Sequence, residues 1–572
     1  MRWFGGTVGC TGPVSPVPSE ARLLWDGEFP LWLAGDWPEH EVVALQVGGR
    51  RIAVLGPCAA RPEELRCLLD GTPGRIPLWA GSFTVVIAQE HRGVTVFTDL
   101  GGATPIYTAC AAGGTVWGSS SRALAPLTGG RPDAAWLAAS FVAPDRLTPG
   151  RSAFAGVALV EAGSRLVLRP GRAPDAVAAW SPREGTFQEA AERLRTALED
   201  GVEARLRGAV RPSSDCSGGA DSTAMCLLAE RHRRPGEPLL AVTVHPAGVT
   251  TGGDMDYARE VVEGRDGLRH LLLPLGAEQA PYAALDRLAA ATDEPAPSTV
   301  TYRRLSAEAE LLSGLGGDCH FTGDGGDSLL WQPLHLVDLA RTRRWRRLLR
   351  DAVAWARLHQ SDPWPLIVGA FSRTAPAARV EAAGWATSTA CELAMEVSAA
   401  EDDRRGWTRT DVQVLRQIQT VGRTAQADGQ LIEGWGVPMH NPFTDGAVID
   451  AALTAPSMER GAPDKYKPLL SAALADVYPE SVAGRATKGI SDADHYRGLR
   501  ENRDTVLSMA DGELAALGLV DPARFAGALQ LAAAGVPGLL DGLRPAVAAE
   551  VWLRTISAAQ EVRWVFRERG EG

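Results

Sequence analysis

Two glycine-rich segments carry the residue types best suited to chemistry. The first, CSGGADSTAMCLLAE, combines small, hydroxyl and acidic residues directly before an apolar helical pattern: Ser217, Gly218, Gly219, Asp221, Ser222 and Thr223. Glycine lets the backbone approach an anion closely, and the N–H groups at the start of a helix favour negative charge. The segment predicts a pocket for phosphate or pyrophosphate, with Asp221 as a ligand for the Mg²⁺ of a nucleotide. A plain turn that caps a helix is the simpler alternative.

The second segment, FTGDGGDSLLW, follows about a hundred residues later and holds Gly323, Asp324 and Asp327. Its glycines predict a tight turn at the end of a strand, which would bring both carboxylates to one spot. Asp327 is the expected second anchor for Mg²⁺. No lysine follows the glycines of the first segment, so neither segment is the GxxxxGK[ST] loop of γ-phosphate transfer.

Lysine is rare in this chain. Of its 58 basic residues only three are lysines, Lys465, Lys467 and Lys488, and all lie in one short window. A lysine ammonium is a compact point charge that can reach a phosphate or a reacting oxygen, whereas arginine offers a planar fork. The clustering therefore marks this window as a candidate part of the same site.

The elements that position these residues change in character near residue 180. Before it, short apolar runs are separated by Gly and Pro and predict antiparallel sheets: LWLAG, VVALQV, RRIAVLG, SFTVVIAQ, VTVFTDL, ATPIYTA, TVWGSS and SRLVLRP. Beyond it, a helix is expected from about Thr186, and the runs LLAVTVHP and LRHLLLPL suit buried parallel strands. From Leu334 to about Gly434 the pattern is mostly helical. We expect two domains, 1–180 and 186–572.

Composition narrows the function classes. The formal charge of −11 argues against a nucleic-acid partner, because phosphate backbones are bound by basic surfaces. We find no apolar run of the roughly 18 residues that would suggest a membrane span. The eight cysteines are scattered without a zinc-like spacing. These features predict a cytoplasmic protein with neither a membrane nor a nucleic acid among its partners.

The first glycine-rich segment resembles the PP-loop of ATP pyrophosphatases, and the remaining motifs are similar to those of asparagine synthetases. Those motifs are the G-D-G-x-D turn, ATDEPAPS, NPFTDGAVID and DKYKPLLSAALADVYPESVAGRATKG. The resemblance implies ATP and Mg²⁺ as cofactors and Asp324 as a base for the reacting amine. It also implies that Lys467 opens the K-x-x-L helix and that Lys488 stabilises negative charge on the pyrophosphate and the tetrahedral intermediate. Ser471 departs from the arginine common at its position.

The N-terminal part looks like the glutaminase domain of class B asparagine synthetases, with Asp99, Pro105 and Tyr107 matching its D-x-x-G-x-x-P-x-Y pattern. That domain uses an N-terminal cysteine as nucleophile, whereas Arg2 follows Met1 here, and Leu55 and Gly56 replace the Asn-Gly that binds glutamine. We therefore expect a degenerate glutaminase and a nitrogen donor that is an amine of the substrate itself. The implied fold is α/β: an Ntn-hydrolase-like layered β-sandwich, then a PP-loop ATP pyrophosphatase domain with large helical additions.

Two related families have lost the glutaminase, the β-lactam synthetases and the lasso peptide cyclases. The chain resembles the cyclases more, because it keeps Asp324 where β-lactam synthetases usually have Tyr, and because of its long helical section with RTRRWRRLLRDAVAWARL. The resemblance implies ATP-dependent closure of a macrolactam, through an acyl-adenylate, between a peptide's N-terminal amine and an Asp or Glu side chain. The implied partners are the precursor peptide, a leader-binding protein and a leader protease.

Three alternatives remain open. A β-lactam synthetase would form a small ring, and an ammonia-dependent asparagine synthetase would act on aspartate. A scaffold that only binds nucleotide would need neither both metal anchors, Asp221 and Asp327, nor Lys488. The helix in RTRRWRRLLRDAVAWARL could equally be a solvated basic face without a peptide contact.

Overall fold

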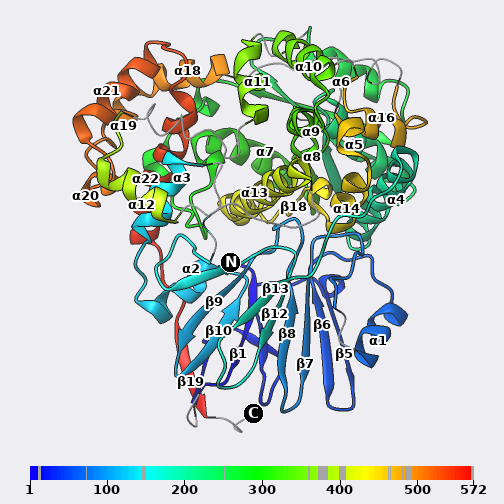
Figure 1. The fold of residues 1–572 in the computed structure, drawn as a ribbon, viewed down its shortest axis with the longest axis vertical. Coiled ribbons are helices and arrows are strands. Elements are labelled where there is room, and N and C mark those ends of the chain that lie inside the picture. The colour runs from blue at the N-terminus through cyan, green and yellow to red at the C-terminus, as the bar shows by residue number, and fades with distance from the viewer. Residues whose placement is uncertain are drawn as a thin grey trace.

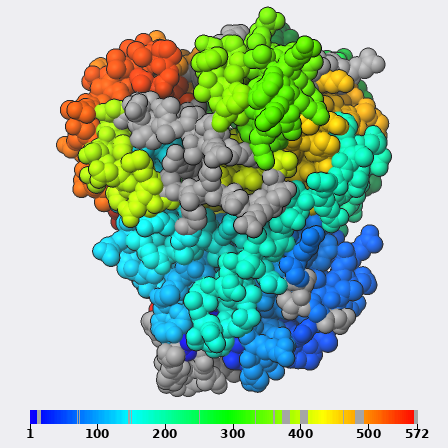
Figure 2. All heavy atoms as spheres, viewed as in Figure 1, coloured from blue at the N-terminus to red at the C-terminus, as the bar shows by residue number. Residues whose placement is uncertain are grey.

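The protein has a mixed α/β fold in which strands stacked at one end meet a larger part where helices surround a parallel sheet (Figure 1). The computed structural model describes residues 1–10, 14–71, 74–144, 148, 150–249, 251–331, 333–358, 361–371, 384–397, 408–461, 463, 465–479, 482 and 492–568. The blue to cyan N-terminal residues lie at the bottom of Figure 1, and the green to orange residues lie above them. The same division is visible on the surface in Figure 2.

Two six-stranded antiparallel sheets form most of the N-terminal part, with the orders β11-β9-β10-β1-β4-β3 and β13-β12-β8-β7-β6-β5. The first consists of β1 (Trp3–Val8), β3 (Arg22–Trp25), β4 (Leu31–Ala34), β9 (Ile106–Ala111), β10 (Gly114–Gly118) and β11 (Val157–Val160). The second consists of β5 (Val42–Val47), β6 (Arg50–Leu55), β7 (Thr84–Gln89), β8 (Gly93–Phe97), β12 (Ser164–Leu168) and β13 (Asp175–Ala178). The eight apolar runs of the sequence each overlap one of these strands.

The two sheets share one apolar core. Phe4 and Trp117 of the first sheet belong to the same buried cluster as Val86 and Val96 of the second. Alternate residues of a strand point to the same face, so the inward residues of each sheet face those of the other. The smaller elements are η1 (Glu39–Glu41), α1 (Pro62–Asp70), α2 (Ser121–Leu124), η2 (Ala125–Thr128) and α3 (Ala134–Val142).

A five-stranded parallel sheet forms the centre of the larger part, in the order β16-β15-β14-β17-β18. Its strands are β14 (Pro212–Asp215), β15 (Leu239–Pro246), β16 (Leu268–Leu275), β17 (Cys319–Phe321) and β18 (Met439–His440). Pro212 is the first residue of β14, a position where a strand tolerates proline. The chain adds strands on one side of β14 and then on the other. A crevice for ligands is therefore expected at the carboxyl ends beside β14.

Helices cover this sheet and extend it. Around it lie α4 (Phe187–Leu206), α5 (Ala220–His232), α6 (Asp254–Val262), α7 (Tyr302–Gly314) and α8 (Gly326–Leu330), with the short turns η3 (Ala277–Gln279), η4 (Leu285–Arg287) and η5 (Pro297–Thr301). Thr186 caps α4 by accepting a hydrogen bond from the Glu189 N–H, so the helix begins where the sequence predicted it. None of the helices that the structure describes has the length and apolar character needed to cross a membrane.

The helical additions follow β17. They comprise α9 (His335–Arg341), α10 (Trp345–Leu358), α11 (Pro363–Phe371), α12 (Ser388–Val397), α13 (Arg409–Ile432), η7 (Glu433–Trp435), η8 (Pro442–Thr444), α14 (Gly446–Thr454), α15 (Ser457–Arg460), α16 (Pro468–Ala473), α18 (Asp492–Glu501), α19 (Arg503–Leu507), α20 (Glu513–Ala516), α21 (Pro522–Ala533) and α22 (Leu540–Ala558). The chain ends with β19 (Trp564–Glu568), which pairs with β2 (Val14–Pro18). The last strand is thereby joined to one of the first.

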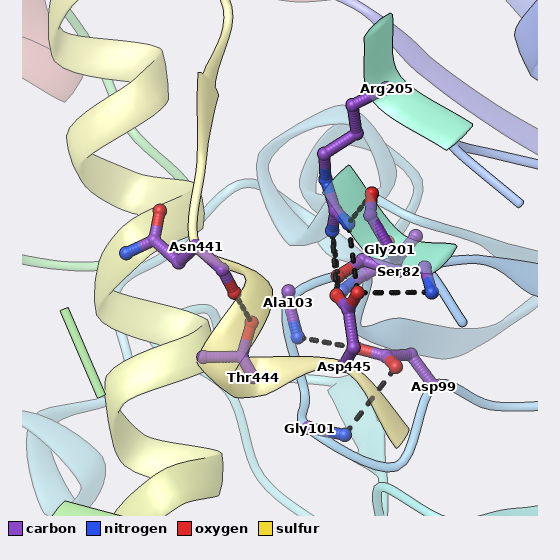
Figure 3. Close-up of polar contacts among 11 residues, drawn as sticks. Ser82, Asp99, Gly101, Ala103, Gly201, Arg205, Asn441, Thr444 and Asp445 are labelled. Carbon is purple, nitrogen blue, oxygen red and sulfur yellow. Dashed lines mark hydrogen bonds and ion pairs between the residues drawn. The ribbon is translucent and has the colours of Figure 1, made fainter. Parts of the chain in front are cut away.

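A buried ion pair of the larger part forms hydrogen bonds with the N-terminal part (Figure 3). Arg205 of α4 donates two hydrogen bonds to Asp445, at 2.6 and 2.8 Å, and both side chains are essentially inaccessible to solvent. Asp445 also accepts hydrogen bonds from the Gly81 N–H and the Ser82 hydroxyl of the N-terminal part, both at 3.0 Å. Thr444 donates to the Asn441 carbonyl in the same turn and keeps the turn closed. The NPFTDG motif thus fixes the end of β18 against the N-terminal part.

A second junction uses the ATDEPAPS motif. The buried Asp293 carboxylate accepts hydrogen bonds from the Ser120 hydroxyl at 2.6 Å and from the Arg122 N–H at 2.8 Å. Gln430 of α13 donates to the same carboxylate at 2.6 Å. Two motifs that the sequence likened to asparagine synthetases therefore connect the N-terminal sheets to the larger part.

Candidate active site

The phosphate-loop residues lie between β14 and α5, at the carboxyl end of the central strand. Gly218 has a φ of +74°, which glycine adopts without strain. The hydroxyls of Ser217 and Ser222 lie 2.8 Å apart and close the loop on itself. Gly219 is the N-cap residue of α5 and has no side chain to cap it, while Thr223 is buried one turn into the helix. The loop thus presents the start of α5 as an anion site.

The second glycine-rich segment packs directly on this helix start. A Cβ atom on Gly323 would lie 2.6 Å from the Ser222 backbone nitrogen, and one on Gly326 would lie 2.2 Å from an Asp221 carboxylate oxygen. Glycine is required at both positions because a side chain would collide with α5. This close approach brings Asp327, in the first turn of α8, next to Asp221.

Lys467 lies between those two carboxylates. Its ammonium forms ion pairs with Asp221 and, at 2.7 Å, with Asp327, and the side chain is fully buried. Lys467 is the N-cap residue of α16 and holds a left-handed conformation with a φ of +45°, which costs a non-glycine residue energy. Burial disfavours its charge, but Asp221 and Asp327 outweigh that effect and raise the pKa of Lys467 above its usual value.

The site can also accommodate Mg²⁺. Asp221 and Asp327 supply the carboxylate oxygens that Mg²⁺ prefers, and both contact the same ammonium, so the two groups lie close together. The Asp327 side chain is 43% exposed, so an ion can reach it from the solvent side. Lys467 occupies the position between the carboxylates that the sequence analysis had assigned to the metal alone. Lys488 lies outside the described residues.

Asp324 faces a polar cavity of about 180 Å³ at the carboxyl ends of β14, β17 and β18. The residue is exposed, and its backbone N–H is bonded to the Thr322 hydroxyl at 3.2 Å. The cavity lies among α7, α13 and the strand ends, and four carboxylates line it: Asp215, Glu308, Asp324 and Asp428. One guanidinium, that of Arg304, also lines it.

Three of these cavity residues were missed by the sequence reasoning, which chose only Asp324. Asp215 could have been noticed, because a carboxylate directly before the phosphate loop is unusual in a buried strand. Glu308 and Asp428 each lie in a helix with other polar residues, so the sequence carries no signal for either. His320, buried in β17, was also missed; its Nε2 atom lies 3.5 Å from Asp215 Oδ1 and 3.8 Å from Glu308 Oε1.

Burial dominates the titration of this cluster. It raises the pKa of Glu308 to about 8, with a further contribution from the charge of Asp215. Burial opposes ionisation of Asp215 too, but the hydrogen bond and charge of the neighbouring His320 outweigh burial and lower the pKa of Asp215. Burial disfavours the His320 imidazolium, yet Asp215 and Glu308 raise its pKa overall. Burial also raises the pKa of Asp428 to about 7.

Comparison with known proteins agrees with this geometry. The family model of asparagine synthase matches residues 193–554. A search of curated proteins finds no match. Solved structures that match include a glutamine phosphoribosylpyrophosphate amidotransferase from B. subtilis, in complex with ADP and GMP, and a structure titled as the allosteric regulatory enzyme of purine biosynthesis. Both are 10% identical, cover 49% and 50% of this chain and 82% of their own, and have TM-scores of 0.20 and 0.21, too low to support an argument.

A phosphate loop on a parallel sheet, with two adjacent carboxylates and a buried lysine, defines an enzyme that uses ATP. The family match spans more than half of the chain, and the chain belongs to the asparagine synthase family. It is therefore an ATP-dependent enzyme that forms amide bonds.

Proposed function

We propose that the enzyme closes a macrolactam in a peptide, as in lasso peptide biosynthesis. A side-chain carboxylate of Asp or Glu in the peptide would be activated as an acyl-adenylate, and the peptide's N-terminal amine would displace AMP. ATP is a co-substrate of this reaction and leaves as AMP and pyrophosphate.

The observation that carries the proposal is the position of Asp324. It lines the acidic cavity, while Asp327, three residues further on, contacts the lysine that also contacts Asp221 of the phosphate loop. One short loop therefore reaches both the nucleotide side and the side from which an amine would attack. A carboxylate-lined cavity suits an amine that arrives as an ammonium ion, and Asp324 can take its proton.

The residues of the site have separate roles in the proposed reaction. The start of α5 and the hydroxyls of Ser217 and Ser222 bind phosphate oxygens, and Lys467 keeps Asp221 and Asp327 together. Mg²⁺, held by Asp221 and Asp327, would neutralise charge on the phosphates. Leu55 and Gly56 stand where the resembling glutaminases bind glutamine, which supports an amine supplied by the substrate. A leader-binding protein and a leader protease are the proposed partners, and they would deliver the peptide.

Mass spectrometry of a leader-free candidate peptide, incubated with the full-length enzyme, ATP and Mg²⁺, tests the proposal. We expect the peptide to lose one water while AMP and pyrophosphate form in equal amounts. The same peptide with an acetylated N-terminus should not cyclise. Pyrophosphate release with small amino acids but not with peptides would instead indicate β-lactam or asparagine formation.

A further inference from the structure

The cavity beside Asp324 contains a cluster that the proposed reaction does not yet use. Asp215 ends β14, His320 belongs to β17, and Glu308 lies on α7, yet one ligand atom of each lies within 4.8 Å of the others. Glu308 is 8% exposed, and among the described residues its buried Oε1 atom lies 3.8 Å from His320 Nε2, too far for a hydrogen bond, and has no closer donor. A buried carboxylate oxygen without a donor is costly unless a ligand supplies one.

The carboxyl groups of this cluster can supply the negative charge that binds a cation. Two carboxyl groups face one imidazole, so a protonated His320 leaves one negative charge unbalanced once Glu308 ionises, which its raised pKa of about 8 places at mildly alkaline pH. The other titratable and charged groups of the cavity are Asp324, Asp428 and Arg304. Four carboxylates against one guanidinium and one imidazolium make the cavity acidic.

An ammonium group fits these acceptors better than a metal ion does. A metal would bind a neutral His320 through Nε2, whereas the Asp215 and Glu308 carboxyl groups, 3.5 and 3.8 Å from that atom, also stabilise the protonated ring. The other ring nitrogen, Nδ1, is already bonded to the Ser213 hydroxyl at 2.9 Å. An ammonium carries three N–H donors and can bond several carboxylate oxygens at once.

Resting on the proposed function, we infer that Glu308 is the residue that binds the ammonium form of the attacking amine in this cavity. Asp215 and His320 are positioning residues that hold the Glu308 carboxylate towards the cavity. The reaction releases two protons: the ammonium gives up one to become a nucleophile, and the nitrogen loses the second once the C–N bond has formed and the C–O bond to AMP has broken. Glu308, whose pKa burial raises to about 8, is ionised above that pH and then accepts the first of these protons, while Asp324 accepts the second.

The test uses glycinamide, which carries a small ammonium group, with N-acetylglycinamide as its neutral counterpart. Thermal unfolding of the full-length protein should show stabilisation by glycinamide alone. Glu308→Gln should weaken that binding at least about tenfold, because it removes a charged acceptor. Glu310→Gln is the matched control, since Glu310 is exposed on the same helix. Equal stabilisation of wild type and Glu308→Gln would overturn the inference, as would stabilisation by Zn²⁺ or Mn²⁺ but not by glycinamide.

A second measurement separates this inference from the proposed function. With a peptide that wild type cyclises, Glu308→Gln should still release pyrophosphate but form the amide at least about tenfold more slowly. Amide formation at the wild-type rate would refute the role of Glu308 while the proposed function stands. Absence of cyclisation by wild type, with glycinamide binding intact, would refute the proposed function and leave the ammonium site standing.

Discussion

At the scale of single residues, Lys467 is the centre of the site. Burial of the Lys467 ammonium and the left-handed backbone conformation of this residue both cost free energy. The arrangement persists because two carboxylates compensate the charge. The same contacts keep the phosphate loop and the G-D-G-x-D turn together. The lysine therefore links binding of phosphate to the position of Asp324.

Replacing Lys467 by methionine should abolish ATP-dependent pyrophosphate release. It should also lower the free energy of unfolding by about 3–5 kcal/mol, because Asp221 would be left as an uncompensated buried charge. Urea unfolding followed by tryptophan fluorescence measures the second effect. Lys465→Met is the control, because Lys465 is exposed two residues earlier. Wild-type pyrophosphate release by Lys467→Met would contradict this role.

Asp327→Asn should raise the Mg²⁺ concentration needed for half-maximal pyrophosphate release by at least about tenfold, since it removes one of two carboxylate ligands. Titration of Mg²⁺ at fixed ATP concentration measures the shift. Asp494→Asn, an exposed carboxylate on α18, should leave it unchanged. An unaltered Mg²⁺ requirement in Asp327→Asn would show that the metal binds elsewhere.

At the scale of elements, α9 to α11 form a helical unit, and the two tryptophans of α10 have different roles. Trp355 of α10 is completely buried, with its ring 5.0 Å from that of Trp331. Trp345, on the same helix, is 45% exposed and stacks on Phe371. α10 and α11 project at the top of the molecule (Figure 2). The sequence left open whether this segment contacts a peptide or is a solvated basic face, and the structure places one of its two tryptophans in the core.

Trp355→Ala should destabilise the protein by about 3–5 kcal/mol through loss of packing. Trp345→Ala should have a much smaller effect, because a partly exposed side chain loses little burial when it is truncated. Chemical denaturation of both variants provides the comparison. Similar losses in the two variants would mean that α10 packs differently.

The pH dependence of α10 follows from Asp351. Burial opposes its ionisation, but hydrogen bonds from His335, Arg350 and Arg347 outweigh this and lower the pKa to about 2. The unfolded value is about 3.9, so this contribution to stability is complete above about pH 4 and is lost as the pH falls towards about 2. Asp351→Asn should flatten the decrease in stability over that interval, measured by urea unfolding at several pH values. An identical acid profile in the variant would contradict the assignment.

The strands and the glycine loops could be predicted because their signals are local. Short apolar runs separated by Gly and Pro identified the antiparallel strands, and the SGGADS and GDGGD spacings identified both loops. The Asp215–Glu308–His320 cluster could not be predicted, because it joins two strands and a helix and depends on how α7 packs on the sheet. For the same reason the sequence suggested metal alone between Asp221 and Asp327. The clustered lysines did mark the Lys467 window as part of the site, but the contact of this ammonium with both carboxylates depends on a strained turn that has no sequence signature.

At the scale of the whole molecule, the N-terminal sheets are integrated with the synthetase part rather than loosely attached. The Arg205–Asp445 pair also bonds Gly81 and Ser82, and Asp293 bonds both Ser120 and Gln430. The N-terminal sheets thus support the strand ends that carry the cavity.

Asp445→Ala should therefore destabilise the whole molecule by about 3–5 kcal/mol, since Arg205 would be left as a buried, unpaired charge. Calorimetry should show a lower transition temperature for both parts together. Asp476→Ala breaks an exposed pair with Arg195 and should change it little. Loss of stability confined to the synthetase part would argue against a supporting role of the sheets.

An oxygen-18 transfer measurement tests most directly whether ATP activates a carboxylate that an amine of the same peptide then attacks. The acceptor carboxylate of a peptide is labelled and the products are analysed by mass spectrometry. If the carboxylate is adenylated, we expect one labelled oxygen in AMP and the other in the cyclised peptide. Label in inorganic phosphate, or none in AMP while the amide forms, would contradict this mechanism.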